Sequence, residues 1–546
     1  MKDTIFTKFS RIIKSHQNDC WLTAIIILML LWKAILISKN VFPFNSDEAI
    51  VALMAKHILS GERPIFFYGQ AYMGSLDAYL VAFGFAIVGQ KVVVIRIVQS
   101  LLYAFTIVIT YFIGKMAFQS ARSALITALI LAFPTINGMI YTTISLGGYG
   151  EALLLGVLQI LITLKIKKTL DESSFSFHLY LFMGFLTGLG FWVHGMTLVF
   201  SIPCWLYLLY KFMSKKIPRK SVLYTLLFII IGFALGILPM IIFVFQQGSQ
   251  SVWMELFGSA VSVETGGWFS RVLNHLLYLL IFGIPVMFGL RPPWTTILQI
   301  PWLIPFVVLA VLLIGYVLYQ EIRKRILPEA AYLFLGIILI LFAAFVGTSF
   351  GVDPSGRYFL PLIIPGSLLA GYAVGKLIGV NKAFSFIVIV FCLYQIMVTW
   401  HLANKPPYLT TQFYTPAMLN HDYDEELIAF LKENDLETGY SNYWVAYPLA
   451  FLSDEALIYI PALPYHPDFR FTERDNRYTP YTEIVEYSDN VSYIVTNNPD
   501  LEDVLTSEFS WRNISFSYQE IGDFHIYYDL SELIRPDQLR PKFYVK

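Results

Sequence analysis

The sequence has few charged residues and very few cysteines. Only 14% of its 546 residues are Asp, Glu, Lys or Arg, whereas soluble domains carry roughly 25%. Its three cysteines, Cys20, Cys204 and Cys392, lie in or beside apolar segments and form no CxxC pair, which excludes a disulfide framework and a zinc-thiolate site. A Walker A loop and a GxGxxG motif are also absent from the sequence, so a pump driven by nucleotide hydrolysis is not supported.

Hydrophobic residues, in contrast, make up 57% of the chain. This exceeds what the cores of soluble domains bury, so lipid must act as a second solvent. We therefore predict a mainly α-helical polytopic membrane protein with about eleven transmembrane helices of roughly 20 residues each. The apolar segments begin near Trp21, Val92, Ser123, Gly150, Leu179, Gly195, Ser221, Ile300, Ala330, Tyr358 and Ala383.

The charges are divided unevenly along the chain. Of 38 acidic residues 24 follow His401, against 10 of the 38 basic residues. The basic excess of the earlier part lies in short loops, such as Lys165 to Lys168 and Arg323 to Arg325, where it indicates cytoplasmic loops and argues against nucleic-acid binding. We expect an integral protein of the cell (plasma) membrane whose N-terminus, with the basic residues Lys2 to Lys14, is cytoplasmic.

The segment from Leu276 to Leu290 is ambiguous. It is apolar but short, it contains Gly283 and Pro285, and counting it as a span would move Arg323 to Arg325 outside. We predict a re-entrant or interfacial piece on the outer side. Because eleven is an odd number, the acidic C-terminal part is then extracytoplasmic.

That C-terminal part resembles a folded domain in its pattern. Apolar residues recur at helical spacing in Asp424 to Lys432, and strand-like stretches occur at Leu457 to Ile460, Val491 to Thr496 and Asp523 to Tyr528. We therefore predict two domains: a membrane-embedded domain, residues 1–401, with a first outer loop at 39–91, and a small extracytoplasmic α/β domain, residues 402–546.

Carboxylates assigned to the outer face are the first candidates for function, because charges at membrane depth are costly and commonly functional. Asp47 and Glu48 follow the first helix closely and precede the apolar spacing Ile50, Leu53 and Met54, which predicts a short amphipathic helix. Ser46 or Asp47 could instead cap that helix. The other outer carboxylates are Glu62, Asp77, Glu151, Glu255, Glu264 and Asp353.

The first outer loop resembles that of a known superfamily. Asp47-Glu48 is followed by Gly61-Glu62-Arg63-Pro64, an apolar stretch from Ala78 to Val88, and Gly89 and Arg96 at the start of the second helix. Later, Glu151 lies in the second outer loop and Gly356-Arg357-Tyr358 opens a late helix. This pattern, over about the first 400 residues, resembles the C-type (GT-C) membrane glycosyltransferases, which include protein O-mannosyltransferases and the aminoarabinose transferase of lipid A.

The resemblance implies a glycosyltransferase that uses a polyprenyl-phosphate sugar donor on the outer face and inverts the anomeric carbon. It assigns the catalytic base to Asp47, which would orient the acceptor hydroxyl and take its proton. The leaving phosphate needs cations, for which Arg357 is our first candidate and Arg96 our second. A boundary arginine that snorkels to the lipid–water interface is the alternative for Arg357.

Three further residues are weaker candidates. Glu48, Glu151 and His194 could bind the acceptor or a divalent metal, but a structural hydrogen bond is the favoured role for the two glutamates, and a helix cap or interface role is favoured for the histidine. Without a dense Asp/Glu/His motif the metal requirement is unknown. Trp253, Trp268, Trp294 and Trp302 are expected in the interfacial belt, and only secondarily as stacking partners for sugar rings.

Two other functions stay open at this stage. A transporter or flippase would place charges and broken helices near the bilayer midplane in two halves of a repeat, and no repeat is visible. A non-catalytic outer-face binding protein would use the acidic C-terminal part and leave Asp47 as a helix cap. The sequence identifies neither the sugar nor the acceptor, which could be lipid, glycan or protein.

Overall fold

The computed structural model describes residues 17–172, 174–215, 219–248, 252, 266–353, 355–466, 468–470 and 472–540. These residues form two compact units. The helical unit consists of the described parts of 1–39, 97–143 and 148–404. The α/β unit consists of 40–96, 144–147 and the described part of 405–546. Each unit is described separately.

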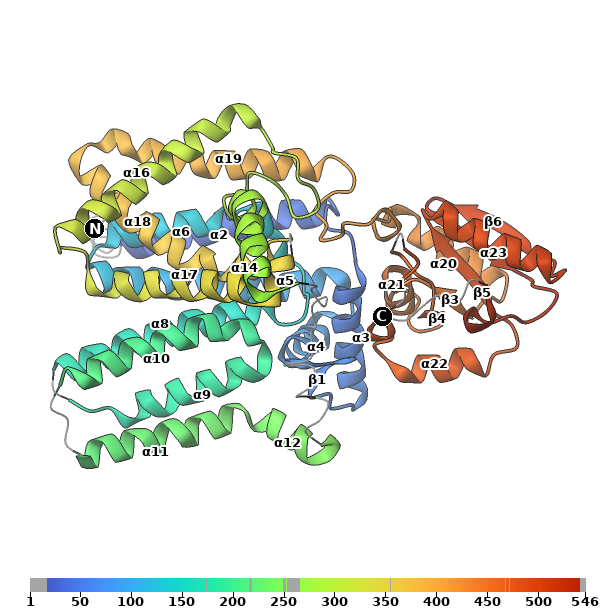
Figure 1. Cartoon of the computed structure of the whole chain (residues 1–546), viewed down its shortest axis with the longest axis horizontal. Helices are drawn as coiled ribbons and strands as arrows, with labels where there is room; N and C mark the ends of the chain where they lie inside the picture. The colour runs from blue at the N-terminus through green and yellow to red at the C-terminus, as the bar shows by residue number, and fades with distance from the viewer. Residues whose placement is uncertain are drawn as a thin grey trace, which may run out of the picture. The chain divides into compact units, whose positions relative to one another are not determined.

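The helical unit is built from long apolar helices (Figure 1). Helices α8, α9, α10 and α11 lie side by side, and α6 packs against α18. Its described helices are α2 (Gln17–Ser38), α5 (Val92–Phe118, whose first turn belongs to the α/β unit), α6 (Ala121–Ala132), α7 (Ile136–Tyr141), α8 (Tyr149–Asp171), α9 (Phe177–Val193), α10 (Leu198–Met213), α11 (Arg219–Gly236), α12 (Leu238–Gln247), α14 (Trp268–Tyr278), α15 (Ile284–Met287), α16 (Ile304–Arg323), α17 (Glu329–Gly347), α18 (Ile363–Val380) and α19 (Ser385–Ala403).

Nine of the described helical segments are long and apolar enough to cross a membrane, or ten if the bent pair Lys220–Gly236 and Leu238–Gln247 forms one span. The prediction of a mainly helical, polytopic membrane protein is confirmed. Each of the eleven predicted segments contains a helix, but α6 and α9, with 12 and 17 residues, are short for a membrane span.

The ambiguous segment at 276–290 is longer than the sequence suggested. Its helical stretch begins at Trp268 and reaches Met287, which makes it a candidate span of 20 residues. The first part of this stretch was not recognised in the sequence, because its apolar pattern is interrupted by Arg271, Asn274 and His275. The segment is not continuous α-helix, because a π-helical turn (Leu279–Gly283) separates α14 from α15. Whether it spans or is re-entrant stays a prediction.

The α/β unit contains a mixed five-stranded sheet in the order β4-β3-β5-β7-β6. Strand β3 (Thr438–Ser441) pairs in parallel with β4 (Ile458–Pro461) and β5 (Ser492–Thr496), whereas β7 (Phe524–Tyr528) pairs antiparallel with β5 and β6 (Ser517–Ile521). All residues of β4 and β5 are buried, as is typical of parallel strands covered on both faces. The three predicted strands are confirmed, each starting one residue later.

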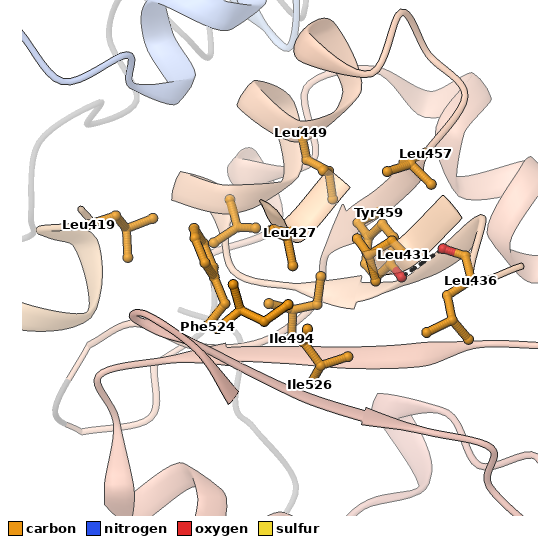
Figure 2. Close-up of a cluster of buried hydrophobic side chains, with 12 residues drawn as sticks. Leu419, Leu427, Leu431, Leu436, Leu449, Leu457, Tyr459, Ile494, Phe524 and Ile526 are labelled. Carbon is orange, nitrogen blue, oxygen red and sulfur yellow. Dashed lines mark hydrogen bonds between the residues drawn. The ribbon is translucent and has the colours of Figure 1, made fainter. Parts of the chain in front are cut away.

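The core of this sheet is formed by leucines and isoleucines from helices and strands (Figure 2). Leu427 and Leu431 come from α20 (Asp424–Glu433), the predicted helix, and Leu449 from α21 (Tyr443–Leu452). The hydroxyl of Tyr459 donates to the carbonyl oxygen of Leu436 at 3.0 Å, so this buried phenol is satisfied. The remaining C-terminal helices are α22 (Thr479–Glu486) and α23 (Pro499–Trp511).

Residues 40–96 belong to the same unit as the sheet. They form α3 (Ser46–Ser60), the short hairpin β1 (Phe66–Phe67) and β2 (Gln70–Gly74), and α4 (Leu76–Val88). Helix α3 packs against both α4 and α21. The predicted first outer loop is therefore folded, and part of the apolar surface of α21 is covered by residues far away in sequence. The domain boundary at residues 401 and 402 stays a prediction.

Candidate functional site

Asp47 lies in the first turn of α3 but does not cap it. Asn45 is the N-cap, and its side-chain oxygen accepts a hydrogen bond from the backbone N–H of Glu48 at 3.1 Å. Our alternative that Ser46 or Asp47 caps the helix is therefore wrong, because Ser46 is already the first residue of the helix and the cap precedes it. The carboxylate of Asp47 remains available for other contacts, while its place in the first turn suits its negative charge.

The half-buried carboxylate of Asp47 contacts a tyrosine from the C-terminal part of the chain. The hydroxyl of Tyr443, the first residue of α21, donates to Oδ1 of Asp47 at 2.6 Å. Ser46 donates from its hydroxyl to the backbone carbonyl of Tyr443, which ties the two helix starts together a second time. Within the described part of the structure no donor contacts Oδ2 of Asp47, so this oxygen keeps a free lone pair.

Charged groups surround this contact. The guanidinium of Arg477 lies over the ring of Tyr443, 5.4 Å from its centroid. When the side-chain amide of Gln70 is oriented so that both its oxygen and its nitrogen have partners, the oxygen accepts a hydrogen bond from Nη2 of Arg477 at 2.7 Å. Burial raises the pKa of Asp475 to about 7; Arg477 opposes this shift and Asp47 adds to it. The α/β unit thus brings two carboxylates, a guanidinium and a phenol together at the start of α3.

Glu48 and Arg96 form a buried ion pair in the same unit. Nε and Nη2 of Arg96 donate to the two carboxylate oxygens of Glu48 at 3.2 and 3.1 Å, and Nη2 also donates to the carbonyl of Phe42 at 2.9 Å. Both residues are at most 2% exposed. Burial raises the pKa of Glu48 and Arg96 opposes this shift. The structure therefore brings two predicted site residues together as a bidentate pair.

Glu151 lies in the first turn of α8, in the helical unit. It is 2% exposed, and Nε2 of Gln99 donates to its Oε1 at 3.3 Å. A carboxylate buried at this depth is consistent with the structural hydrogen bond that we considered for it. The structure does not test whether it contacts an acceptor.

Arg357 lies in the same unit, at the start of the 3-10 turn η5 (Arg357–Leu362). Its Nε pairs with Oδ2 of Asp353 at 2.6 Å, and its guanidinium lies 4.9 Å from the ring centroid of Tyr358. The rings of Tyr141 and Tyr149, in the same unit, pack edge to face with centroids 4.9 Å apart. The Arg357 side chain as a whole is 40% exposed, while its Nε atom is buried.

His194 connects α9 to the following helix and lies against Tyr149, with ring centroids 4.7 Å apart. Its Nδ1 accepts from the backbone N–H of Met196 at 3.1 Å, so it caps the short turn that follows. Burial lowers the pKa of His194 to about 4, and the neighbouring Arg357 adds to the shift. The imidazole is therefore neutral near pH 7.

Among the described residues, no group of three or more His, Cys, Asp or Glu side chains is arranged to hold a metal ion. Glu255, Glu264, Trp253 and the basic residues from Lys2 to Lys14 lie outside the described residues. Sequence reasoning missed Tyr443, Asp475 and Arg477. No signal in the sequence could have found them, since Tyr443 is 396 residues away from Asp47.

Comparisons with known proteins identify the fold. Residues 75–243 match the family model of dolichyl-phosphate-mannose-protein mannosyltransferases. No curated protein matched the chain in sequence. In structure the chain resembles ArnT from Cupriavidus metallidurans in the apo state, with a TM-score of 0.58, 12% identity and coverage of 93% of this chain and 98% of ArnT.

Two further structures agree. ArnT from the same organism bound to undecaprenyl phosphate matches with a TM-score of 0.54 and 12% identity over 94% of this chain and 99% of ArnT. The oligosaccharyltransferase of Archaeoglobus fulgidus in complex with Zn and sulfate matches with a TM-score of 0.52 and 12% identity over 93% of this chain and 73% of that one. The expected resemblance is confirmed: the chain is a polytopic membrane protein with the C-type glycosyltransferase fold.

Proposed function

We propose that this protein is a membrane glycosyltransferase that moves a sugar from a polyprenyl-phosphate donor to an extracytoplasmic acceptor. The observation that carries the proposal is the environment of Asp47. Its carboxylate does not cap α3. One carboxylate oxygen accepts a hydrogen bond from Tyr443, and the other oxygen is free. That is the arrangement a general base needs.

The match to dolichyl-phosphate-mannose-protein mannosyltransferases and the likeness to an ArnT structure bound to undecaprenyl phosphate support a polyprenyl-phosphate donor. In the proposed reaction the acceptor hydroxyl oxygen forms a bond to the anomeric carbon. The bond from that carbon to the phosphate oxygen breaks, and polyprenyl phosphate leaves with the electron pair. Asp47 takes the hydroxyl proton. A single displacement of this kind inverts the anomeric carbon.

We assign the phosphate to Arg357, whose partly exposed side chain would offer its Nη groups while Nε stays paired with Asp353. Arg96 as a second phosphate ligand stays a prediction, and it would require Arg96 to leave Glu48. We further propose a cytoplasmic N-terminus and an extracytoplasmic C-terminal part in the cell membrane, from the basic loops. The sugar and the kind of acceptor stay open.

Mass spectrometry of envelope glycans, lipids and glycoproteins from a deletion strain tests the proposal. We expect one sugar to be missing, to return with the wild-type gene, and to return far more slowly with Asp47→Asn. Asp489→Asn is the matched control, because Asp489 is an exposed carboxylate of the same unit. An envelope with every sugar intact in the deletion strain would contradict the proposal.

A further inference from the structure

The starting point is how firmly Tyr443 is fixed. It is the first residue of α21 and only 2% exposed. Asn442 caps this helix by accepting from the backbone N–H of Trp444 at 2.9 Å. The backbone carbonyl of Tyr443 accepts a hydrogen bond from the hydroxyl of Ser46, and α21 packs against α3. The phenol therefore has little freedom to turn away from Asp47.

The phenol acts here as a hydrogen-bond donor. Burial raises the pKa of Tyr443, and the neighbouring Asp47 raises it further, so the hydroxyl keeps its proton at any physiological pH. Its oxygen lies 2.6 Å from Oδ1, the length expected for a hydrogen bond to a charged acceptor. The guanidinium of Arg477, which contacts Gln70, also packs over the ring of Tyr443.

Such a contact would fix the direction of the free oxygen. With Oδ1 held by Tyr443, rotation of the Asp47 carboxylate about its last torsion is restricted, and Oδ2 keeps one orientation. A base is effective only when it lies within hydrogen-bond reach of the proton it takes. We propose that Tyr443 is a positioning residue for Asp47, so that the C-terminal part of the chain contributes to the transfer reaction. This inference rests on the proposed role of Asp47 as base.

A double-mutant cycle tests the proposal. The readout is the rate at which the missing sugar returns to the deletion-strain envelope after induction of each variant. Tyr443→Phe keeps the ring and removes the hydroxyl, and we expect the rate to fall roughly 10-fold or more, as for the loss of a hydrogen bond to a charged group. In the Asp47→Asn background, Tyr443→Phe should lower the rate by no more than about twofold. A residue that acts only through the Asp47 carboxylate has no role left once that carboxylate is removed.

A purely structural tyrosine would behave differently, and its removal would lower the rate by the same factor in both backgrounds. That result would overturn the proposal, as would wild-type rate in Tyr443→Phe alone. Tyr493→Phe is the matched control, since Tyr493 is equally buried in the same sheet unit but donates to the carbonyl of Ile534. It should leave the rate unchanged.

A spectroscopic measurement keeps the inference testable if Tyr443→Phe fails to fold or the proposed function is wrong. The full-length protein in nanodiscs carries 3-fluorotyrosine at position 443, and its ¹⁹F resonance is recorded with and without Asp47→Asn. We expect the resonance to move on loss of the carboxylate, whereas fluorotyrosine at position 493 should not respond. No change at position 443 would overturn the contact. A deletion strain with no missing sugar would contradict the proposed function instead, so the two failures are distinguishable.

Discussion

The guanidinium of Arg357 and the carboxylate of Asp47 are expected to respond differently to substitution. Arg357 would contact the donor phosphate both before and during transfer. Arg357→Ala should therefore weaken the binding of undecaprenyl phosphate as well as turnover, by about 1.5 to 3 kcal/mol for a charged hydrogen bond. Arg357→Lys should recover only part of the loss, because a point charge replaces a two-pronged donor.

Native mass spectrometry or a lipid-binding assay in nanodiscs measures this affinity. Arg323→Ala is a suitable control, since Arg323 is an exposed arginine at the end of α16. If Arg357→Ala leaves the affinity for undecaprenyl phosphate unchanged, Arg357 does not bind the phosphate and is a boundary residue that pairs with Asp353.

Asp475 predicts a pH dependence of stability. Its pKa rises from the ordinary 3.8 to about 7 on folding. The folded chain then keeps a proton that the unfolded chain has lost, so the free energy of unfolding falls as the pH rises from about 4 to about 7, by at most about 1.4 kcal/mol per unit. Asp475→Asn removes this loss and should raise the melting temperature more at pH 8 than at pH 5.

Thermal melts of the purified protein, followed by tryptophan fluorescence at both pH values, measure the difference. The exposed Asp500 provides the control substitution Asp500→Asn. An equal gain at pH 5 and pH 8 would show that the raised pKa of Asp475 does not contribute to stability.

At the scale of elements, the packing of α9 on α11 depends on glycines. Gly184 and Gly188 on α9 face the backbone of α11, and Gly232 and Gly236 on α11 face that of α9. A Cβ added at Gly184 would lie 2.3 Å from the carbonyl oxygen of Ile229. This is the close backbone approach known from small-residue motifs in membrane helices.

Gly184→Leu should therefore force the two helices apart and cost about 1 to 3 kcal/mol through overpacking. Gly315→Leu on α16 is the matched control, because a Cβ there meets nothing within 4 Å. The melting temperature in detergent should fall for Gly184→Leu and change little for Gly315→Leu. Equal melting temperatures for both variants would contradict this packing.

The sequence pattern predicted some elements well and missed others for identifiable reasons. Strands β4, β5 and β7 and helix α20 were predicted because their apolar residues recur regularly and are buried. Helix α21 was missed because it is apolar on every side and contains Pro448. Strand β6 was missed because its first four residues are not buried and its sequence is mostly polar.

The candidate site could be predicted only in part. Asp47, Glu48 and Arg96 stand out because charges are rare in this chain, but their partners follow from the tertiary fold. Asn45 rather than Ser46 caps α3, and Tyr443 reaches Asp47 from a helix that the pattern did not reveal. Local spacing carries no information about contacts that join segments about 400 residues apart.

For the whole molecule, the orientation in the membrane is the main prediction. Fusions to reporters that are active on one side only should report cytoplasm near Lys168 and Lys324, and the outside near Asp47, Asp353 and Asn420. Basic residues retained in the cytoplasm are the physical reason. An outside signal at Lys324 would show that the candidate span Trp268–Met287 crosses the membrane.

The most direct test of the account is the transfer rate of Asp47→Asn with the polyprenyl-phosphate sugar that accumulates in the deletion strain. The purified protein in nanodiscs receives this donor, and the release of polyprenyl phosphate is followed alongside donor binding. If Asp47 is the base, the substitution should lower turnover by roughly 100-fold or more while donor affinity stays nearly unchanged, because the interaction is used mainly in the transition state. Wild-type turnover in Asp47→Asn would contradict the account.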